Sequence, residues 1–535
     1  MSLSGAPLAN LNTSDARACH DYLAALPLTN AHEAHRNLSA LLATMSRRPP
    51  PAAEYLRVLE AARVPLSFVQ DELALRYADK PLPPSEHEEQ SFHQVLALWQ
   101  MMARAYAHVA QLGDDDTHVR QGLALICQRC VHYTGRVILE YFRARREAAP
   151  GVWIDLHGYY DTAEEWGIAT VAVPEPLSEA RKSQSSSEAY AAILLVDLAN
   201  PYSHGTHEFA WISRWADRFA PYTALTRPND KTTPATTHAF GVDLMHDHGV
   251  RPLERLKQRE SLRHFDTSRL MPEMRNIIAQ LKQYVAPVTL GLGEDCSTMA
   301  AGRLLMQLYR PWCLHAMPRR FQRREASGAA KVGLGFEAIH YYISGEEFNQ
   351  PEHVRLYSRN DMERIWTFRD HLDPAHLKSR AAHIHYPLEV WDVADQSVSG
   401  FRLQRGAAGA RIEHGQLFCL KPPDGEHFLL ARVSWYLMLD ATNWLLIGVH
   451  VLPGVPQALA VRATGAAVSP SQHYTRAFLL PALPALKEPD TLVLPPGWFH
   501  PARIIEVYTD RQVRVQLTDL LTHGPDFERV SFVRL

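Results

Sequence analysis

The chain has 535 residues, of which 46% are hydrophobic and 21% are charged, and its formal net charge is −3 at pH 7. This length exceeds what one hydrophobic core supports, so we expect about three domains. The small negative charge argues against bulk nucleic-acid binding. The sequence has no apolar run long enough for a membrane helix, so we expect no membrane span.

The six cysteines are too sparse and scattered for a disulfide framework, which indicates a reducing compartment. The first residues also lack the basic region and apolar stretch of a signal peptide. We therefore expect a cytoplasmic protein.

Helical patterns dominate residues 1–312. Ser85 and Glu88 form a capping-box pattern, and behind them apolar residues recur at steps of three and four. The same spacing predicts a helix around residues 123–141 and further helices within 186–203, 208–225 and 271–285. We expect a helical region at 1–150 and a second at 151–312, arranged as a bundle or an α-solenoid.

Strand patterns dominate from residue 313 onward. Residues 427–439 and 443–452 read as two antiparallel strands, and residues 502–517 read as another pair. Short strands at this spacing are typical of small barrels. We expect a first β-barrel at 313–465, with a charged insertion at about 346–382. The proline-rich segment 479–498 is interpreted as its boundary with a small C-terminal β unit at 466–535.

A basic segment precedes the first strand. It contains four arginines in six residues, Arg319, Arg320, Arg323 and Arg324. The planar guanidinium group matches phosphate oxygens and the O6/N7 edge of guanine, and it can stack on a purine. The alternative is a charge run that merely faces solvent.

A polar break at residues 395–400 interrupts a strand-rich stretch. It contains Asp395, Ser397 and Gly400, with apolar strand-like sequence on both sides. A hairpin turn is the simplest interpretation, because aspartate and serine bond to nearby backbone and glycine accepts positive φ.

Taken together, the two segments resemble the PilZ family of small six-stranded barrels that bind the bacterial messenger cyclic di-GMP. The matching pattern is Arg319-x-x-x-Arg323, or the overlapping Arg320-x-x-x-Arg324, followed by Asp395-x-Ser397-x-x-Gly400. Residues 433–435 and 447–449 also resemble the later strands of that family.

This resemblance implies a role for each of these residues. It assigns the arginines to phosphates and guanine edges, and Asp395 and Ser397 to the guanine edge that carries N–H donors. It assigns Gly400 to a close turn of the backbone. One departure from the family is that Arg323 and Asp395 are unusually far apart in sequence. The insertion at 346–382 accounts for that distance and could cover or remodel the site.

Other clusters favour structural explanations. Cys127 and Cys130 have C-x-x-C spacing, but both lie on an apolar helix stripe, so packing is favoured over metal binding. A turn-forming loop is favoured over a metal site for Asp243, His246, Asp247 and His248. His383 and His385 alternate on one strand face, and an exposed barrel surface is the favoured interpretation.

The sequence thus predicts an α+β multidomain protein with a helical N-terminal region, a PilZ-like six-stranded β-barrel and a second small β unit. We expect a cyclic di-GMP receptor with no cofactor and no metal, which signals to an unidentified protein partner through its helical region. Two alternatives stay open. The barrel could be a degenerate scaffold that binds only protein, or the helical region could be an enzyme using residues such as Asp155 or His246.

Overall fold

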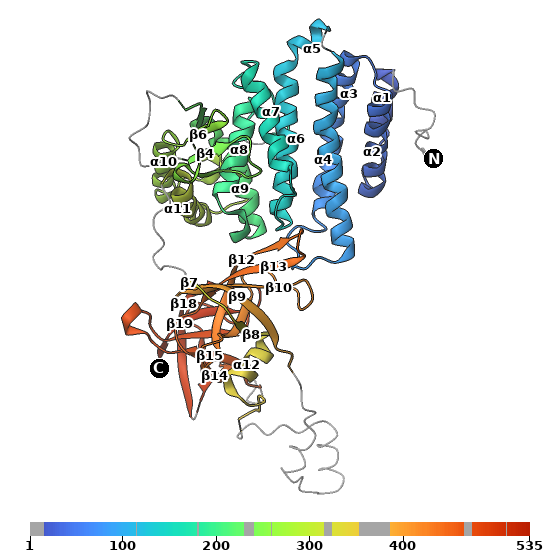
Figure 1. Ribbon diagram of the computed structural model, residues 1–535. Helices are drawn as coiled ribbons and strands as arrows, with labels where there is room; N and C mark the ends of the chain where they lie inside the picture. Colours follow the sequence, from blue (N-terminus) through green and yellow to red (C-terminus); the bar gives the residue numbers. More distant parts are fainter. Residues whose placement is uncertain are drawn as a thin grey trace, which may run out of the picture. The chain divides into compact units, whose positions relative to one another are not determined.

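The structure is a computed structural model, shown in Figure 1. It describes residues 15–113, 115–178, 181–228, 240–257, 259–314, 324–351, 386–397, 399–464, 473–509 and 511–535. The chain divides into two compact units. The first comprises Met1–Arg319 with Leu437–Ala441, and the second comprises Arg320–Tyr436 with Thr442–Leu535.

The first unit begins with helices that pack side by side (Figure 1). They are α1 (Ala16–Ala24), α2 (Ala31–Arg47), α3 (Ala52–Ala74), α4 (Glu86–Leu112), α5 (Thr117–Gln121), α6 (Leu123–Arg143) and α7 (Val152–Glu165). The predicted capping box at Ser85 and Glu88 is present at the start of α4. In the part of the chain that the structure describes, no helix is long and apolar enough to span a membrane.

The second half of this unit mixes helices with short strands. It contains β1 (Val173–Pro174), β2 (Ser183–Gln184), α8 (Ser186–Leu198), α9 (Thr206–Phe219), α10 (Leu270–Lys282) and α11 (Thr298–Cys313). A four-stranded sheet in the order β3-β6-β4-β5 lies within the region expected to be helical. Its strands are β3 (Ala224–Thr226), β4 (Phe240–Asp243), β5 (Arg251–Pro252) and β6 (Leu262–Asp266). These strands are too short to give a periodic signal in the sequence.

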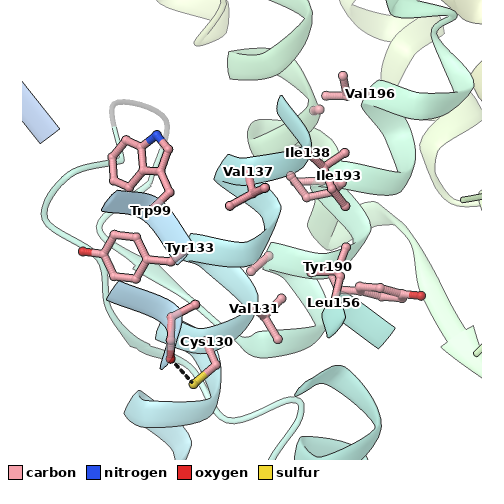
Figure 2. Packing of buried hydrophobic residues seen from close by; sticks show 14 of the residues in the cluster. Trp99, Cys130, Val131, Tyr133, Val137, Ile138, Leu156, Tyr190, Ile193 and Val196 are labelled. Carbon is pink, nitrogen blue, oxygen red and sulfur yellow. Dashed lines mark hydrogen bonds between the residues drawn. The ribbon is translucent and has the colours of Figure 1, made fainter. Parts of the chain in front are cut away.

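The predicted apolar stripe of α6 lies in the core of the first unit. Figure 2 shows Ile138 of this helix packed close to Ile193 of α8, and Val131 and Val137 belong to the same core. Cys130 is 3% exposed in the same core, and its thiol donates a weak hydrogen bond to the carbonyl oxygen of Ala103 at 3.6 Å.

The second unit begins with the predicted first barrel. Its elements are β7 (Arg324–Glu325), β8 (Ala329–Leu334), α12 (Phe336–Ser344), β9 (Glu389–Ser397), β10 (Gly400–Gly406), β11 (Leu417–Lys421), β12 (Leu429–Leu439) and β13 (Trp444–Val451). The strand order is β10-β13-β12-β11-β8-β9, and pairing of β9 with β10 closes these six strands into a ring. The helix α12 lies where the sequence suggested strands, and the insertion expected at 346–382 falls almost wholly outside the described residues.

The C-terminal β unit is a second closed barrel. Its strands are β14 (Gln457–Ala463), β15 (Thr475–Leu480), β16 (Thr491–Leu494), β17 (Ile504–Tyr508), β18 (Gln512–His523) and β19 (Glu528–Arg534), in the order β14-β15-β16-β19-β18-β17. Two features differ from expectation. The barrel starts at Gln457, inside the range expected for the first barrel, and the proline-rich segment 479–498 runs within it through β16. The segment therefore lies within one barrel and does not separate two units.

A half-buried carboxyl group links the two barrels. The backbone N–H of Leu417 at the start of β11 donates a hydrogen bond of 2.9 Å to Asp526, which precedes β19. Burial raises the pKa of Asp526 from 3.8 to about 6. The folded protein therefore binds this proton more tightly than the unfolded chain. Protonated Asp526 therefore contributes to the free energy of unfolding. This contribution is fully present below about pH 4 and is lost as the pH rises to about 6.

We predict that Asp526→Asn removes this pH dependence, because the amide oxygen still accepts the Leu417 N–H but carries no charge. Relative to the parent protein, the variant should gain stability as the pH rises from 4 to 7, by up to about 3 kcal/mol. Melting temperatures measured across this range test the prediction, with the exposed Asp424→Asn variant as control. A constant difference between variant and parent would contradict it.

Candidate functional site

The predicted polar break forms a tight hairpin at one end of the first barrel. Ser397, the last residue of β9, pairs with Gly400, the first residue of β10. The backbone N–H of Val451 on β13 donates a hydrogen bond of 3.0 Å to the carbonyl of Ser399, which ties the turn to the next strand. The stretch therefore forms a hairpin, as the simplest interpretation of the sequence expected. Whether the hairpin can also bind a ligand depends on where its side chains point.

A one-residue shift in register turns Asp395 to the outside of the barrel. Leu403 pairs with Val393, whereas its neighbour Arg402 pairs with Asp395, so Ala394 has no counterpart on β10. Val393 and Leu403 are buried in the barrel interior. Because directly paired residues share a face, Asp395 lies on the outer face with Arg402. Regular alternation from Val393 would have pointed it inward.

Asp395 is held there by an ion pair. Its Oδ2 lies 3.0 Å from Nε of Arg402. The Arg402 side chain is 43% exposed, while the side chain of Asp395 is 12% exposed. The carboxylate is thus on the outer face but largely covered.

Ser397 and Gly400 lie on the same outer face as Asp395, and each has its own structural role in the hairpin. The hydroxyl of Ser397 donates a hydrogen bond of 3.2 Å to the carbonyl oxygen of Gly400 and so closes the hairpin. A methyl group on Gly400 would lie 2.2 Å from the carbonyl oxygen of Val449 on β13. Gly400 is not among the glycines with positive φ. Glycine is required here because the neighbouring strand approaches closely, and not because of an unusual φ.

The structure describes only the end of the arginine segment. Arg319, Arg320 and Arg323 lie outside the described residues. Arg324 opens β7 and is exposed, and it pairs with Gln396 of β9, while Glu325 pairs with Asp395. The segment thus enters the barrel beside the hairpin. Alternation along the strand places the side chain of Arg324 on the face opposite to Asp395 and that of Glu325 on the same face.

Two more residues complete a row across the outer face. Arg402 pairs with Gly448 of β13, and a methyl group on Gly448 would lie 2.0 Å from Nε1 of Trp435 on β12. The indole therefore covers the space above Gly448, next to Arg402. From β7 to β12 the row reads Glu325, Asp395, Arg402, Gly448, Trp435. The sequence patterns did not identify Glu325 or Arg402 as part of this face. Trp435 was considered only as one of residues 433–435, which resemble a strand of the PilZ family.

The pKa of a histidine next to the turn is lowered. His450 pairs with Gly400. Its pKa is lowered by burial and, to a lesser extent, by the positive charge of Arg432.

The other candidate clusters have structural roles where the structure describes them. Burial raises the pKa of Cys127 to about 11, which leaves it a thiol in the core. Asp247 accepts hydrogen bonds from the backbone N–H groups of Gly151, at 2.6 Å, and Trp153, at 3.1 Å, at the start of α7. No group of three or more metal-ligating side chains gathers among the described residues. His383 and His385 lie outside them.

Comparison with known proteins gives three consecutive family matches. Residues 17–230 match the family "Cyclic-di-GMP receptor FimW, N-terminal domain", and residues 240–364 match "Cyclic-di-GMP receptor FimW, middle PilZ domain". Residues 459–535 match "FimW C-terminal beta-barrel domain". The chain is also similar to a curated protein of Pseudomonas aeruginosa described as "Cyclic-di-GMP receptor FimW". The two are 23% identical over 514 residues, which cover 89% of this chain and 83% of that protein.

The chain belongs to the FimW family of PilZ-domain proteins. The family resemblance inferred from the arginine and Asp-x-Ser-x-x-Gly patterns is thereby confirmed, as is the order of helical region, PilZ-like barrel and C-terminal β unit. FimW family members are described as receptors, which agrees with the expectation that the chain is not an enzyme. The middle-domain match ends at residue 364, ahead of the Asp395 hairpin in the chain.

The close approach at Gly400 makes a testable prediction. Gly400→Ala should force the Val449 carbonyl away and destabilise the barrel by about 1–3 kcal/mol, the usual effect of overpacking. Gly406 lies at the other end of the same strand, where an added methyl group would meet no atom within 4 Å. Gly406→Ala should therefore change stability by less than about 0.5 kcal/mol. Urea unfolding followed by tryptophan fluorescence compares the two, and equal effects would contradict the packing argument.

Proposed function

We propose that this FimW-family protein is a cytoplasmic receptor that binds cyclic di-GMP at the β9–β10 hairpin, with the arginine segment closing over the ligand. The observation that carries the proposal is the position of Asp395 and Ser397. Both lie on the outer face of a six-stranded barrel, next to the strand into which the arginine segment leads. The P. aeruginosa relative is described as a receptor for the same ligand.

The chemistry of the face suits this ligand. A guanine offers two adjacent N–H donors, and the Asp395 carboxylate is an acceptor that can take both. Arginine forks can bind the two phosphates and the O6/N7 edge of guanine. The Trp435 indole lies on the same face, next to Arg402, and offers a surface for stacking a base.

Of the two arginine readings, the strand register favours Arg319-x-x-x-Arg323. Arg324 pairs with Gln396, and its side chain leaves the barrel on the face away from Asp395. We therefore assign direct contact with the ligand first to Arg319 and Arg323. Arg320 and Arg324 would add positive charge near the ligand and so attract its phosphates.

Signal transfer would follow from fixing the arginine segment. Residues 314–323 connect α11 directly to β7. A ligand that holds these arginines against the barrel would constrain the end of the helical unit, which we propose then presents or withdraws a surface for a protein partner.

Two other functions compete with this proposal. A degenerate PilZ scaffold would bind only protein, and it would give no heat with cyclic di-GMP. An enzyme in the helical unit would need a reactive cluster, whereas Asp247, the loop residue next to His246, serves as a helix cap. A measured turnover would be needed to support that alternative.

We predict that cyclic di-GMP binds the full chain and that Arg323→Ala and Asp395→Ala each weaken binding roughly 10- to 150-fold. Each change removes a charge-assisted contact worth about 1.5–3 kcal/mol. Asp395→Ala should also reduce the preference for cyclic di-GMP over cyclic di-AMP, because the acid reads the base. Isothermal titration calorimetry at two salt concentrations tests both variants, and added salt should weaken the parent more than Arg323→Ala.

Lys421→Ala serves as a matched control, because it removes a single positive charge from a strand of the same barrel away from the β9–β10 hairpin. Its affinity should stay within about twofold of the parent. If both site variants bound like the parent, the hairpin would be a turn without a role in recognition.

A further inference from the structure

Three charged side chains from neighbouring strands stand in one row on the outer face of the barrel. Glu325 of β7 and Arg402 of β10 both pair directly with Asp395 of β9, one on each side. Cross-strand neighbours of this kind have Cβ atoms about 4.5–5.5 Å apart. The carboxylate of Asp395 is therefore flanked by a like charge and an opposite charge.

The contact between Arg402 and Asp395 is electrostatic, so the relative orientation of the two side chains can change. Nε of Arg402 lies 3.0 Å from Oδ2 of Asp395, yet this buried nitrogen makes no aligned hydrogen bond. On the far side of Arg402 stands Gly448, which has no side chain to compete for the guanidinium group. Arg402 can thus stay with Asp395 while the carboxylate turns toward a ligand.

Glu325 has the opposite electrostatic effect on Asp395 and on an anionic ligand. Like charges directly opposite one another on a sheet repel, and a ligand with two phosphates adds further negative charge at the same place. Without Arg402, the ligand would meet the adjacent carboxylates of Glu325 and Asp395 in this row.

We propose that Arg402 is a positioning residue that holds the Asp395 carboxylate for base recognition, and that Glu325 opposes it and weakens the binding of the anionic ligand. This inference rests on the proposed function, because it concerns the same hairpin. It assigns a role to two residues outside the arginine and Asp-x-Ser-x-x-Gly patterns. The balance between the two charges would set the affinity of the site without changing which base it reads.

A double-mutant cycle on the full chain tests the role of Arg402. In about 0.3 M salt, where general charge effects are largely screened, Arg402→Ala should weaken cyclic di-GMP binding about 3- to 5-fold. It should also lower the preference for cyclic di-GMP over cyclic di-IMP, whose base lacks the 2-amino group. In the Asp395→Ala background the same substitution should change affinity less than about twofold, because its target is gone.

Glu325→Gln provides the second arm. It should tighten binding about 2- to 3-fold at low salt, and this gain should shrink as salt is added. Lys331→Ala is the control, since it removes an exposed cation that pairs with Val390, five residues along β9 from Asp395. Its affinity should match that of the parent.

The outcomes separate the two proposals. If the parent binds cyclic di-GMP but Arg402→Ala binds equally well, the positioning role is overturned and the receptor function stands. The role is also overturned if Arg402→Ala causes the same loss with and without Asp395, since Arg402 would then act on the ligand itself. A Glu325→Gln variant that binds more weakly would overturn the opposing role of Glu325. A parent that does not bind cyclic di-GMP would remove the proposed function together with this inference.

Discussion

The one-residue register shift at Ala394 is the constraint on which the candidate site depends. It lets β9 fill the barrel with Trp391 and Val393 and then, within two residues, present Asp395 to the outside. Without the shift, regular alternation would direct this carboxylate into an apolar interior, where an unpaired charge is very costly. A β-bulge of this kind, which re-aims a side chain, is a common device beside binding sites.

The close packing around Gly400 completes this arrangement. The Val449 carbonyl occupies the space of a side chain at Gly400, and the Trp435 indole occupies the space of a side chain at Gly448. Both glycines let a neighbouring group approach the outer face of the barrel. The hairpin is therefore fixed by β13 on one side and by the Ser397 hydroxyl within, so that recognition residues stand on a rigid support.

The barrel that carries the hairpin does not stand alone in its unit. The helix α12 packs against β8 and β11 of the first barrel and against β14 and β15 of the second. His340 of α12 donates a hydrogen bond from Nε2 to the carbonyl of Leu459 on β14 at 3.3 Å. Burial lowers the pKa of His340 to about 4, so it remains neutral at physiological pH. A fragment intended to fold around the hairpin should therefore contain both barrels.

Much of the fold could be predicted from local patterns. The capping box of α4, the stripe of α6 and the strand pairs β12–β13 and β17–β18 follow from periodicity that survives in the structure. The four-stranded sheet of the first unit and α12 could not be predicted, because their segments are short and long-range packing decides their conformation. For the site, the motif identified the hairpin. The register shift and the partners of Asp395 depend on cross-strand pairing, which no spacing in the sequence encodes.

Hydrogen–deuterium exchange of the full chain, with and without cyclic di-GMP, tests the central claim most directly. The account predicts that the ligand slows exchange in peptides covering residues 389–406 and in the arginine segment at 319–324. At a ligand concentration that just saturates the parent, the matching peptides of an Asp395→Ala variant should show clearly less protection. Protection confined to the helical unit, or no protection at saturating ligand, would contradict the assignment of the β9–β10 hairpin as the binding site.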